Sequence, residues 1–196
     1  MADLACHRDR FGWNRYDSGL SSVFTAHKIT LYLGKGSLDL GHKLFRTTPE
    51  TFPIKFLAGY VLDDAQLSLI APVPSGPPPP VASVKTLTEL RGHISAIHTS
   101  RLFHEYNEEL QFELGQRLAA LLDPRPGSII FGSHIGMPVK GDRDGVSGKM
   151  FCHSPESWTQ IWEEQIFEKG QVKVNAALRY LEGAEINMLD WSVERL

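Results

Sequence analysis

The sequence predicts an α/β fold built on an open sheet with parallel strands. Two observations predict it: a strand, a helix and a second strand occur twice along the chain, and short turns join them. A βαβ unit of this kind places its two strands side by side in the same direction. Two such units in one chain of 196 residues favour one continuous sheet and one core.

The first unit begins after residue 28. The run ITLYL at 29–33 is short, β-branched and aromatic, which favours a strand. Residues 34–36 (GKG) form a turn, and Ser37 is a suitable N-cap for a helix that continues to residue 45. The buried run IKFLAGYV at 54–61 then supplies the second strand.

The second unit follows a short helix predicted at 84–91. Its first strand is ISAIHT at 94–99, and Asn107 caps the long helix that comes next. Leucines recur along that helix every three or four residues and form the stripe that packs on a sheet: Leu110, Leu114, Leu118 and Leu121. The run SIIFG at 128–132 completes the unit as a buried strand.

The C-terminal part is predicted to add one helix and one strand. Residues 133–150 are rich in glycine and polar side chains, so we expect a loop there. Ser154 and Pro155 are a cap and a first-turn proline, which start a helix with Trp158 and Trp162 on its buried face. Residues 172–180 largely alternate apolar with polar side chains and are expected to form the terminal strand.

These patterns divide the chain into an irregular segment and one domain. Residues 1–27 contain several aromatic side chains but no clear period, and 28–196 are predicted to form a single α/β domain. Residues 71–82 include PVPSGPPPPV, whose prolines favour a stiff, extended excursion. A boundary between two domains is the alternative, but neither flank is long enough for an independent core.

Bulk composition excludes several classes of protein. The net charge of −3 offers no broad attraction for nucleic acid or for an anionic membrane surface. The two cysteines are too few for a disulfide framework and fit a reducing compartment, so we expect a cytoplasmic protein. The N-terminal residues lack the apolar core of a secretory signal, and no apolar run approaches the ~20 residues of a membrane span.

Five short sequence segments, in a fixed order along the chain, carry a family resemblance. They are FLAGYVLDD, ISAIHTSRLFHEY, LAALLDPRPGSIIFGSHIG, MFCHSPESWTQIWEE and IFEKGQVKVNAAL, and they lie within 37–181. Together they resemble the later part of fungal S-adenosylmethionine-dependent methyltransferases that modify small natural products in secondary metabolism. The resemblance implies a Rossmann-like, mostly parallel sheet with helices on both faces and a final antiparallel strand.

The same resemblance implies where the methyl donor binds. In that family it lies across the carboxyl ends of the first strands, held by a glycine-rich loop after the first strand and by acids after the second and third. Tyr32 and Tyr60 stand where those acids are expected, and no strand with a glycine-rich turn precedes Lys28. Gly34, Gly36 and Gly41 give only GxGxxxxG. The N-terminal part of the sheet is therefore expected to be incomplete.

The candidate site residues follow from the rule that open α/β sheets bind ligands beyond the carboxyl ends of their strands. Those expected to contact S-adenosylmethionine are Tyr60, Val61, Asp63, His98 and Thr99. The small-molecule acceptor is expected to lie against Ser100, Phe103 and His134. His104 is the candidate general base, because imidazole has a neutral fraction at physiological pH. A structural role for this histidine is the simpler interpretation.

Metal chemistry is not predicted. The histidines do not form an HxH or HExxH pair, and no CxxC occurs. Asp142, Asp144 and Gly145 begin like a calcium loop, but its twelfth position is His153 rather than glutamate. The spacing of Trp158 and Trp162 indicates core rather than a substrate pocket.

Two hypotheses for function remain open. The first is a methyltransferase that uses S-adenosylmethionine on a small molecule. The second is a truncated or inactive relic that serves at most as a binding module, and it follows from the missing glycine-rich loop and the two tyrosines. An incomplete sheet exposes unpaired backbone, so the second hypothesis also includes self-association.

Overall fold

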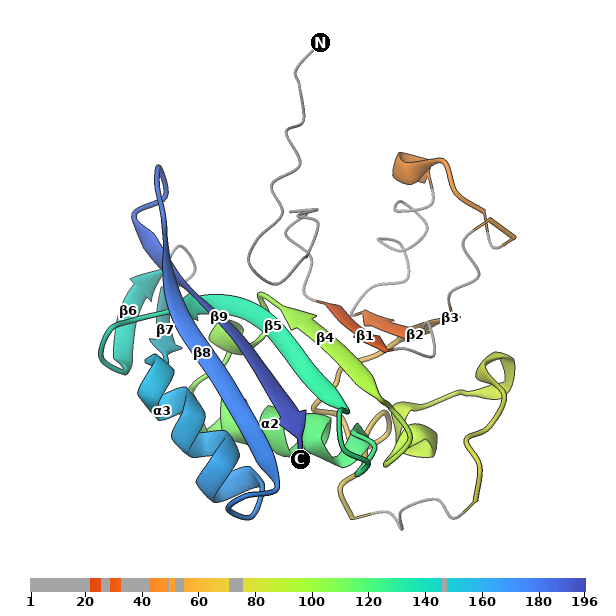
Figure 1. Cartoon of the computed structure of the whole chain (residues 1–196). Helices are drawn as coiled ribbons and strands as arrows, with labels where there is room; N and C mark the ends of the chain where they lie inside the picture. Colours follow the sequence, from red (N-terminus) through yellow and green to blue (C-terminus); the bar gives the residue numbers. More distant parts are fainter. Residues whose placement is uncertain are drawn as a thin grey trace.

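The computed structural model describes residues 22–25, 29–32, 43–48, 50–51, 55–70, 76–145 and 148–196. At 22–25, 29–32, 56 and 58 it describes the backbone alone. The fold is built around a seven-stranded sheet with the order β3-β2-β1-β4-β5-β9-β8 (Figure 1). The strands are β1 (Ser22–Thr25), β2 (Ile29–Tyr32), β3 (Lys55–Ala58), β4 (Ala96–Ser100), β5 (Ile129–Gly136), β8 (Val172–Leu181) and β9 (Ile186–Arg195).

Most of these strands run in one direction. β2 pairs with β3 and β4 with β5 in parallel, whereas β9 is antiparallel to both β5 and β8. β1 is antiparallel to both of its neighbours, β2 and β4. Of the seven strands, β2, β3, β4, β5 and β8 therefore share one direction, and β1 and β9 oppose it. The predicted α/β fold is confirmed, with a mixed sheet: most strands share one direction, whereas only β2–β3 and β4–β5 are parallel neighbours.

The antiparallel strand near the C-terminus is β9, not the segment at 172–180. That segment forms β8, and β9 inserts between it and β5. β9 has a clear signal in the sequence, because buried Leu189, Trp191 and Val193 alternate with less buried Asp190 and Ser192. The prediction ended the sheet one strand too early.

β1 is a strand that the sequence analysis did not place. It occupies the position between β2 and β4, and Ser22 pairs with Ser100 while Thr25 pairs with Ile97. Because it runs opposite to β4, the carboxyl end of β1 lies at the edge of the sheet where β4 begins.

The glycine-rich stretch at 133–150 is largely strand rather than loop. β5 continues to Gly136 because β9 pairs with it along its whole length. A hairpin follows, in which β6 (Gly141–Gly145) pairs antiparallel with β7 (Gly148–Cys152). The prediction was wrong here because glycine and polar residues were taken as loop signals, whereas backbone pairing stabilises these strands.

The helices predicted to begin at Asn107 and Ser154 are both present. α2 (Glu108–Leu121) begins at the Asn107 cap, whose Oδ1 accepts a hydrogen bond from the backbone N of Leu110. α3 (Pro155–Gln160) begins at Ser154 and continues as one π-helical segment, η4 (Ile161–Ile166). Within the described chain, no helix is long and apolar enough to cross a bilayer.

The other expected helices are shorter or lie outside the described residues. The segment predicted as a helix at 84–91 contains the 3₁₀ turn η2 (Leu87–Leu90), preceded by η1 (Val81–Ser83). Only 43–45 of the helix expected at 37–45 are described, and they are helical. The three glycines at 34, 36 and 41 and the proline-rich residues 71–75 lie outside the described part of the chain.

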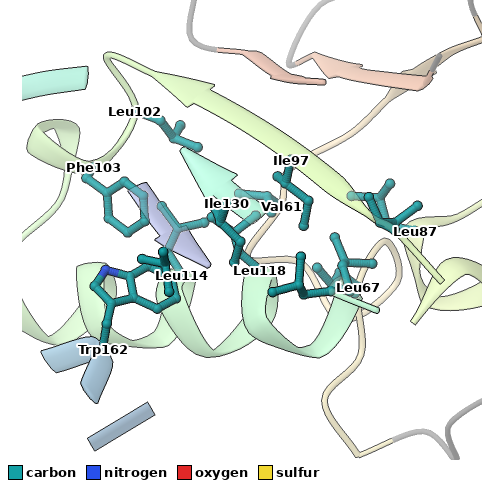
Figure 2. Close-up of a cluster of buried hydrophobic side chains, with 14 of the residues drawn as sticks. Val61, Leu67, Leu87, Ile97, Leu102, Phe103, Leu114, Leu118, Ile130 and Trp162 are labelled. Carbon is teal, nitrogen blue, oxygen red and sulfur yellow. The ribbon is translucent and has the colours of Figure 1, made fainter. Parts of the chain in front are cut away.

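The described helices α2 and α3 pack on the same face of the sheet. Leu114 and Leu118 of α2 are fully buried against strand residues such as Ile97 and Ile130 (Figure 2). Trp158 and Trp162 are also fully buried, which confirms that they belong to the core. Burial of such side chains contributes about 1.5–3 kcal/mol each, so this helix–sheet interface holds the site-bearing edge in place.

Candidate functional site

The carboxyl ends of β2, β3, β4 and β5 meet at one edge of the sheet, because these strands share a direction. Tyr60 follows β3, and residues 101–106 follow β4. The last residues of β5 reach the same edge. Most of the sequence-predicted site residues therefore lie on segments that converge at this edge, which we call the carboxyl edge.

A tyrosine pair joins two of those segments. The rings of Tyr60 and Tyr106 lie 6.2 Å apart, tilted by 52°. Burial, together with the hydrogen bond with Tyr60, raises the pKa of the Tyr106 phenol. Tyr60 itself is 37% exposed. The pair thus offers an aromatic surface that is fixed from behind by Tyr106 and open to solvent at Tyr60.

The turn after β4 is held in a strained conformation. Arg101 has φ of 54°, in the left-handed region that is uncommon for residues with a side chain. Its backbone N donates a 2.7 Å hydrogen bond to the carbonyl of Ser133 on β5. Phe103 anchors the following 3₁₀ turn, η3 (Phe103–Glu105), by packing edge-on against Trp158 at 4.7 Å. Strain of this kind clusters at functional sites.

His104 lies on η3 and is nearly buried. Its Nδ1 accepts a 3.3 Å hydrogen bond from the backbone N of Ile135, and its Nε2 lies 3.3 Å from Oε1 of Glu105. Burial lowers the pKa of His104, Glu105 opposes that shift, and Arg101 adds to it. The imidazole is therefore neutral near pH 7, with the proton on Nε2 facing Glu105. As a base it must first release Nδ1 from Ile135.

Three candidate residues lie along β4 itself. His98 packs its ring 5.0 Å from that of Phe131, and burial lowers its pKa. Thr99 is buried, with its carbonyl so close to Gly132 that a Cβ there would lie 1.6 Å from it. Ser100 is half-buried beside Ser133. These residues form the strand that ends at the carboxyl edge.

Two residues expected to contact the acceptor, Phe103 and His134, lie together in the core. Their rings are 5.5 Å apart, and each is about 1% exposed. His134 accepts a 2.9 Å hydrogen bond from the indole of Trp191 through Nδ1. Burial lowers its pKa well below the usual value. Both side chains therefore support the carboxyl edge from beneath.

The remaining candidates lie in the loop after β3. Val61 is buried and anchors the loop, whereas Asp63 is exposed. Oδ1 of Asp63 accepts a 2.9 Å hydrogen bond from the backbone N of Ala65, which leaves Oδ2 available. β3 ends at Ala58, so Tyr60 and Val61 belong to this loop and not to the predicted strand.

Comparison with known sequences identifies relatives. O-methyltransferase phiE from Fungal sp. (strain ATCC 74256) is 30% identical over 155 residues, which cover 78% of this chain and 45% of that protein. This chain is related to fungal O-methyltransferases. The family resemblance of the five sequence segments is thereby confirmed. No family model matches the chain.

Two further relatives are also methyltransferases. O-methyltransferase atr3 from Stereocaulon alpinum is 25% identical over 65% of this chain and 32% of that protein. Methyltransferase adrK from Penicillium roqueforti is 24% identical over 43% of this chain and 31% of that protein. The chain therefore spans less than half the length of each of these curated relatives.

A solved structure supports the fold. The 1,6-didemethyltoxoflavin-N1-methyltransferase of Burkholderia thailandensis superimposes with a TM-score of 0.54 at 8% identity, over 84% of this chain and 59% of that one. At that identity the likeness concerns the fold alone. It confirms the Rossmann-like fold that the family resemblance implies.

Sequence reasoning missed two residues of the carboxyl edge, Tyr106 and Arg101. Tyr106 stands directly before the helix cap Asn107, and an aromatic residue there is a detectable signal. Arg101 has no signal, because its positive φ arises only when β4, β5 and the buried Phe103 fix the turn from three sides. Within the described segments, no three His, Cys, Asp or Glu side chains form a metal-ligand group.

Proposed function

We propose that this chain carries the donor-binding half of an S-adenosylmethionine-dependent methyltransferase acting on a small molecule of secondary metabolism. The observation that carries the proposal is the match to an O-methyltransferase over 78% of the chain. An edge of aligned strand ends is the usual ligand site of an open α/β sheet. The aligned strand ends at the carboxyl edge support a ligand-binding role for this edge.

The residues at the carboxyl edge fit the adenosine end of the donor. The exposed ring of Tyr60 offers a face for a purine to stack on, with Tyr106 behind it. The free oxygen of Asp63 accepts hydrogen bonds from ribose or from an exocyclic amine. We assign Tyr60, Val61 and Asp63 to the donor, and His98 and Thr99 to the strand that supports it.

When bound, the donor supplies an electrophilic methyl group on a sulfonium ion. This chain's own task is to align donor and acceptor and to accept a proton from an acceptor hydroxyl. We propose that the acceptor lies over Ser100 and that His104 receives the proton at Nδ1 after its bond to Ile135 opens. We place Phe103 and His134 as supports beneath this subsite.

The test is thermal unfolding with and without S-adenosylhomocysteine. At a hundredfold excess over its dissociation constant, a ligand adds ~2.7 kcal/mol of stability, which raises Tm by several degrees. L-Methionine at the same concentration, which lacks the purine and ribose, is the control for nonspecific stabilisation. An unchanged Tm at millimolar S-adenosylhomocysteine and S-adenosylmethionine removes the proposal.

An inactive binding module is the second candidate, and one observation favours it. β1 runs antiparallel to β4, so its carboxyl end is directed away from the carboxyl edge, where a donor-binding loop is needed. This candidate predicts donor binding without turnover, or no binding at all. It also predicts association through the sheet, which size-exclusion chromatography with light scattering detects as a dimer.

We place the protein in the cytoplasm. Cys152 is fully buried and unpaired, and burial raises the pKa of its thiol. A buried thiol of this kind persists reduced in a compartment rich in glutathione. A fluorescent fusion that co-localises with a cytoplasmic marker is the expected result, and an organellar pattern contradicts it.

A further inference from the structure

The loop after β3 is fixed by a buried guanidinium. Arg117 on α2 has a side chain only 6% exposed. Its Nη2 donates to Oε1 of Glu113 at 2.6 Å, and its Nε donates to the same oxygen at 2.9 Å. Glu113 lies one turn earlier on α2, so these two bonds already give the buried charge a partner within its own helix.

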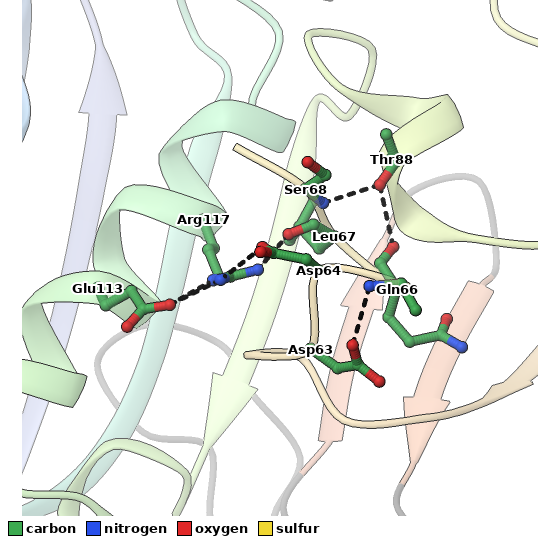
Figure 3. A network of polar contacts seen from close by, with 9 residues as sticks. Asp63, Asp64, Gln66, Leu67, Ser68, Thr88, Glu113 and Arg117 are labelled. Atoms are coloured by element: carbon green, nitrogen blue, oxygen red, sulfur yellow. Dashed lines mark hydrogen bonds and ion pairs between the residues drawn. The ribbon is translucent and has the colours of Figure 1, made fainter. Parts of the chain in front are cut away.

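The other bonds of Arg117 reach a distant segment. Nη2 also donates to Oδ1 of Asp64 at 2.9 Å, and Nη1 donates to the backbone carbonyl of Leu67 (Figure 3). Asp64 and Leu67 lie in the loop after β3, about fifty residues earlier in the sequence. Arg117 therefore uses its spare donors to join α2 to this loop, and the planar fork of donors suits such a junction.

The same loop is held on its other side by Thr88. The backbone N of Thr88 donates to the carbonyl of Gln66 at 3.0 Å, and its Oγ1 accepts from the backbone N of Ser68 at 2.9 Å. Between these anchors, Leu67 is fully buried in the core. Residues 60–67 are thus clamped between α2 and η2, with Tyr60 and Asp63 on the exposed side.

We propose that Arg117 is a positioning residue for donor binding: it holds the 60–67 loop in the conformation that presents Tyr60 and Asp63. The inference rests on the proposed function, because it concerns the affinity of the same site. The side chain of Arg117 is buried, and its bonds outside α2 go to Asp64 and Leu67, so it acts through the loop. The bonds to Asp64 and Leu67 satisfy the donors of Arg117 that Glu113 does not reach, and they tie the guanidinium to the loop.

The test uses Asp64→Ala, because Asp64 is 68% exposed and its removal leaves Arg117 paired with Glu113. Arg117→Lys is the second variant, because it keeps the positive charge and loses the planar set of guanidinium donors. Asp64→Glu is the conservative variant that should restore the bond to Arg117. Asp190→Ala is the matched control, because it removes an ion pair of the same kind with Arg179, at 2.6 Å between β8 and β9.

Two readouts decide the result. Amide hydrogen exchange without ligand is expected to accelerate in residues 60–67 in Asp64→Ala and Arg117→Lys, and to stay unchanged there in Asp190→Ala. Titration with S-adenosylhomocysteine is expected to give a Kd about tenfold higher in both variants, as when the competent conformation is populated about a tenth of the time. Asp64→Glu restores both values.

Failure of the positioning role and failure of the proposed function give different results. Wild-type binding with unchanged exchange and unchanged Kd in both variants overturns the positioning role and leaves the proposed function standing. Wild-type protein that does not bind S-adenosylhomocysteine overturns the proposed function and the donor role of Arg117 together. In that case the exchange data still decide whether Arg117 fixes the loop.

Discussion

The indole Nε1 of Trp191 donates a 2.9 Å hydrogen bond to Nδ1 of His134, and both side chains are almost completely buried. The bond joins β9 to β5 and requires that Nδ1 of His134 carry no proton. His153 is also fully buried, and burial lowers its pKa to about 4. The core beneath the carboxyl edge therefore contains two imidazoles that resist protonation.

The first prediction is that acid destabilises this fold. Between the unfolded pKa near 6.5 and the lowered folded pKa, the unfolded chain binds protons that the folded chain does not, so stability falls as pH falls. The expected slope is up to about 1.4 kcal/mol per pH unit for each such histidine. Urea unfolding at pH 7.5 and pH 5.5 measures it. The slope should be shallower in His134→Gln, and an equal slope in that variant contradicts the assignment to His134.

The second prediction concerns the contact between β4 and β5. In Gly132→Ala the new Cβ lies 1.6 Å from the carbonyl of Thr99, so the two strands must separate. Overpacking of this kind costs about 1–3 kcal/mol or more. Gly141→Ala is the control, because nothing lies within 4 Å of its Cβ. Chemical denaturation that gives both variants the same stability disproves the close approach.

The third prediction concerns the start of α2. Asn107→Ala removes the acceptor for the backbone N of Leu110, so the free energy of unfolding should fall by about 1 kcal/mol. Asn107→Asp keeps an acceptor at the same place and should remain near the wild-type value. The change in Tm on thermal unfolding measures both. A wild-type Tm for the alanine variant means that the cap contributes nothing.

The fourth prediction tests the aromatic surface. Tyr60→Ala removes the exposed ring, and loss of stacking on a purine is worth about 1–3 kcal/mol, so Kd for S-adenosylhomocysteine should rise at least about fivefold. Tyr180→Ala is the control, because Tyr180 is 57% exposed near the end of β8, at the other end of the strand order from β3. Calorimetric titration measures both variants. Equal Kd values for the two place the purine elsewhere.

The fifth prediction separates binding from catalysis. His104→Asn retains an oxygen that accepts from the backbone N of Ile135 but cannot take up a proton near neutral pH. If His104 is the base, methyl transfer should slow about 10²- to 10⁴-fold while donor Kd is unchanged. Transfer to a phenolic acceptor panel, followed by mass spectrometry, gives the rate. A wild-type rate means that the acceptor proton goes to another group.

Sequence patterns were sufficient for the parts of the fold that local rules determine. Asn107 and Ser154 predicted the starts of α2 and α3 correctly, because a side-chain acceptor before an apolar stripe defines a helix end by itself. The βαβ units likewise predicted the parallel pairing of β2 with β3 and of β4 with β5. Each of these signals lies within a few residues of the feature it predicts.

The parts that were missed depend on distant partners. The hairpin of β6 and β7 contains glycine and polar residues, and only its pairing makes it a sheet. The direction of β1 is set by its neighbours β2 and β4, not by its own four residues. The Arg117 junction with the 60–67 loop is invisible in sequence, because about fifty residues separate the two sides.

The most direct test of the central claim is a crystal structure of this chain with S-adenosylhomocysteine. Our account predicts the adenine ring against the face of Tyr60, with ribose or the exocyclic amine hydrogen-bonded to Asp63 at the carboxyl edge. A ligand bound at the opposite edge, beside the carboxyl end of β1, or crystals that remain free of it at saturating concentration, would contradict that account.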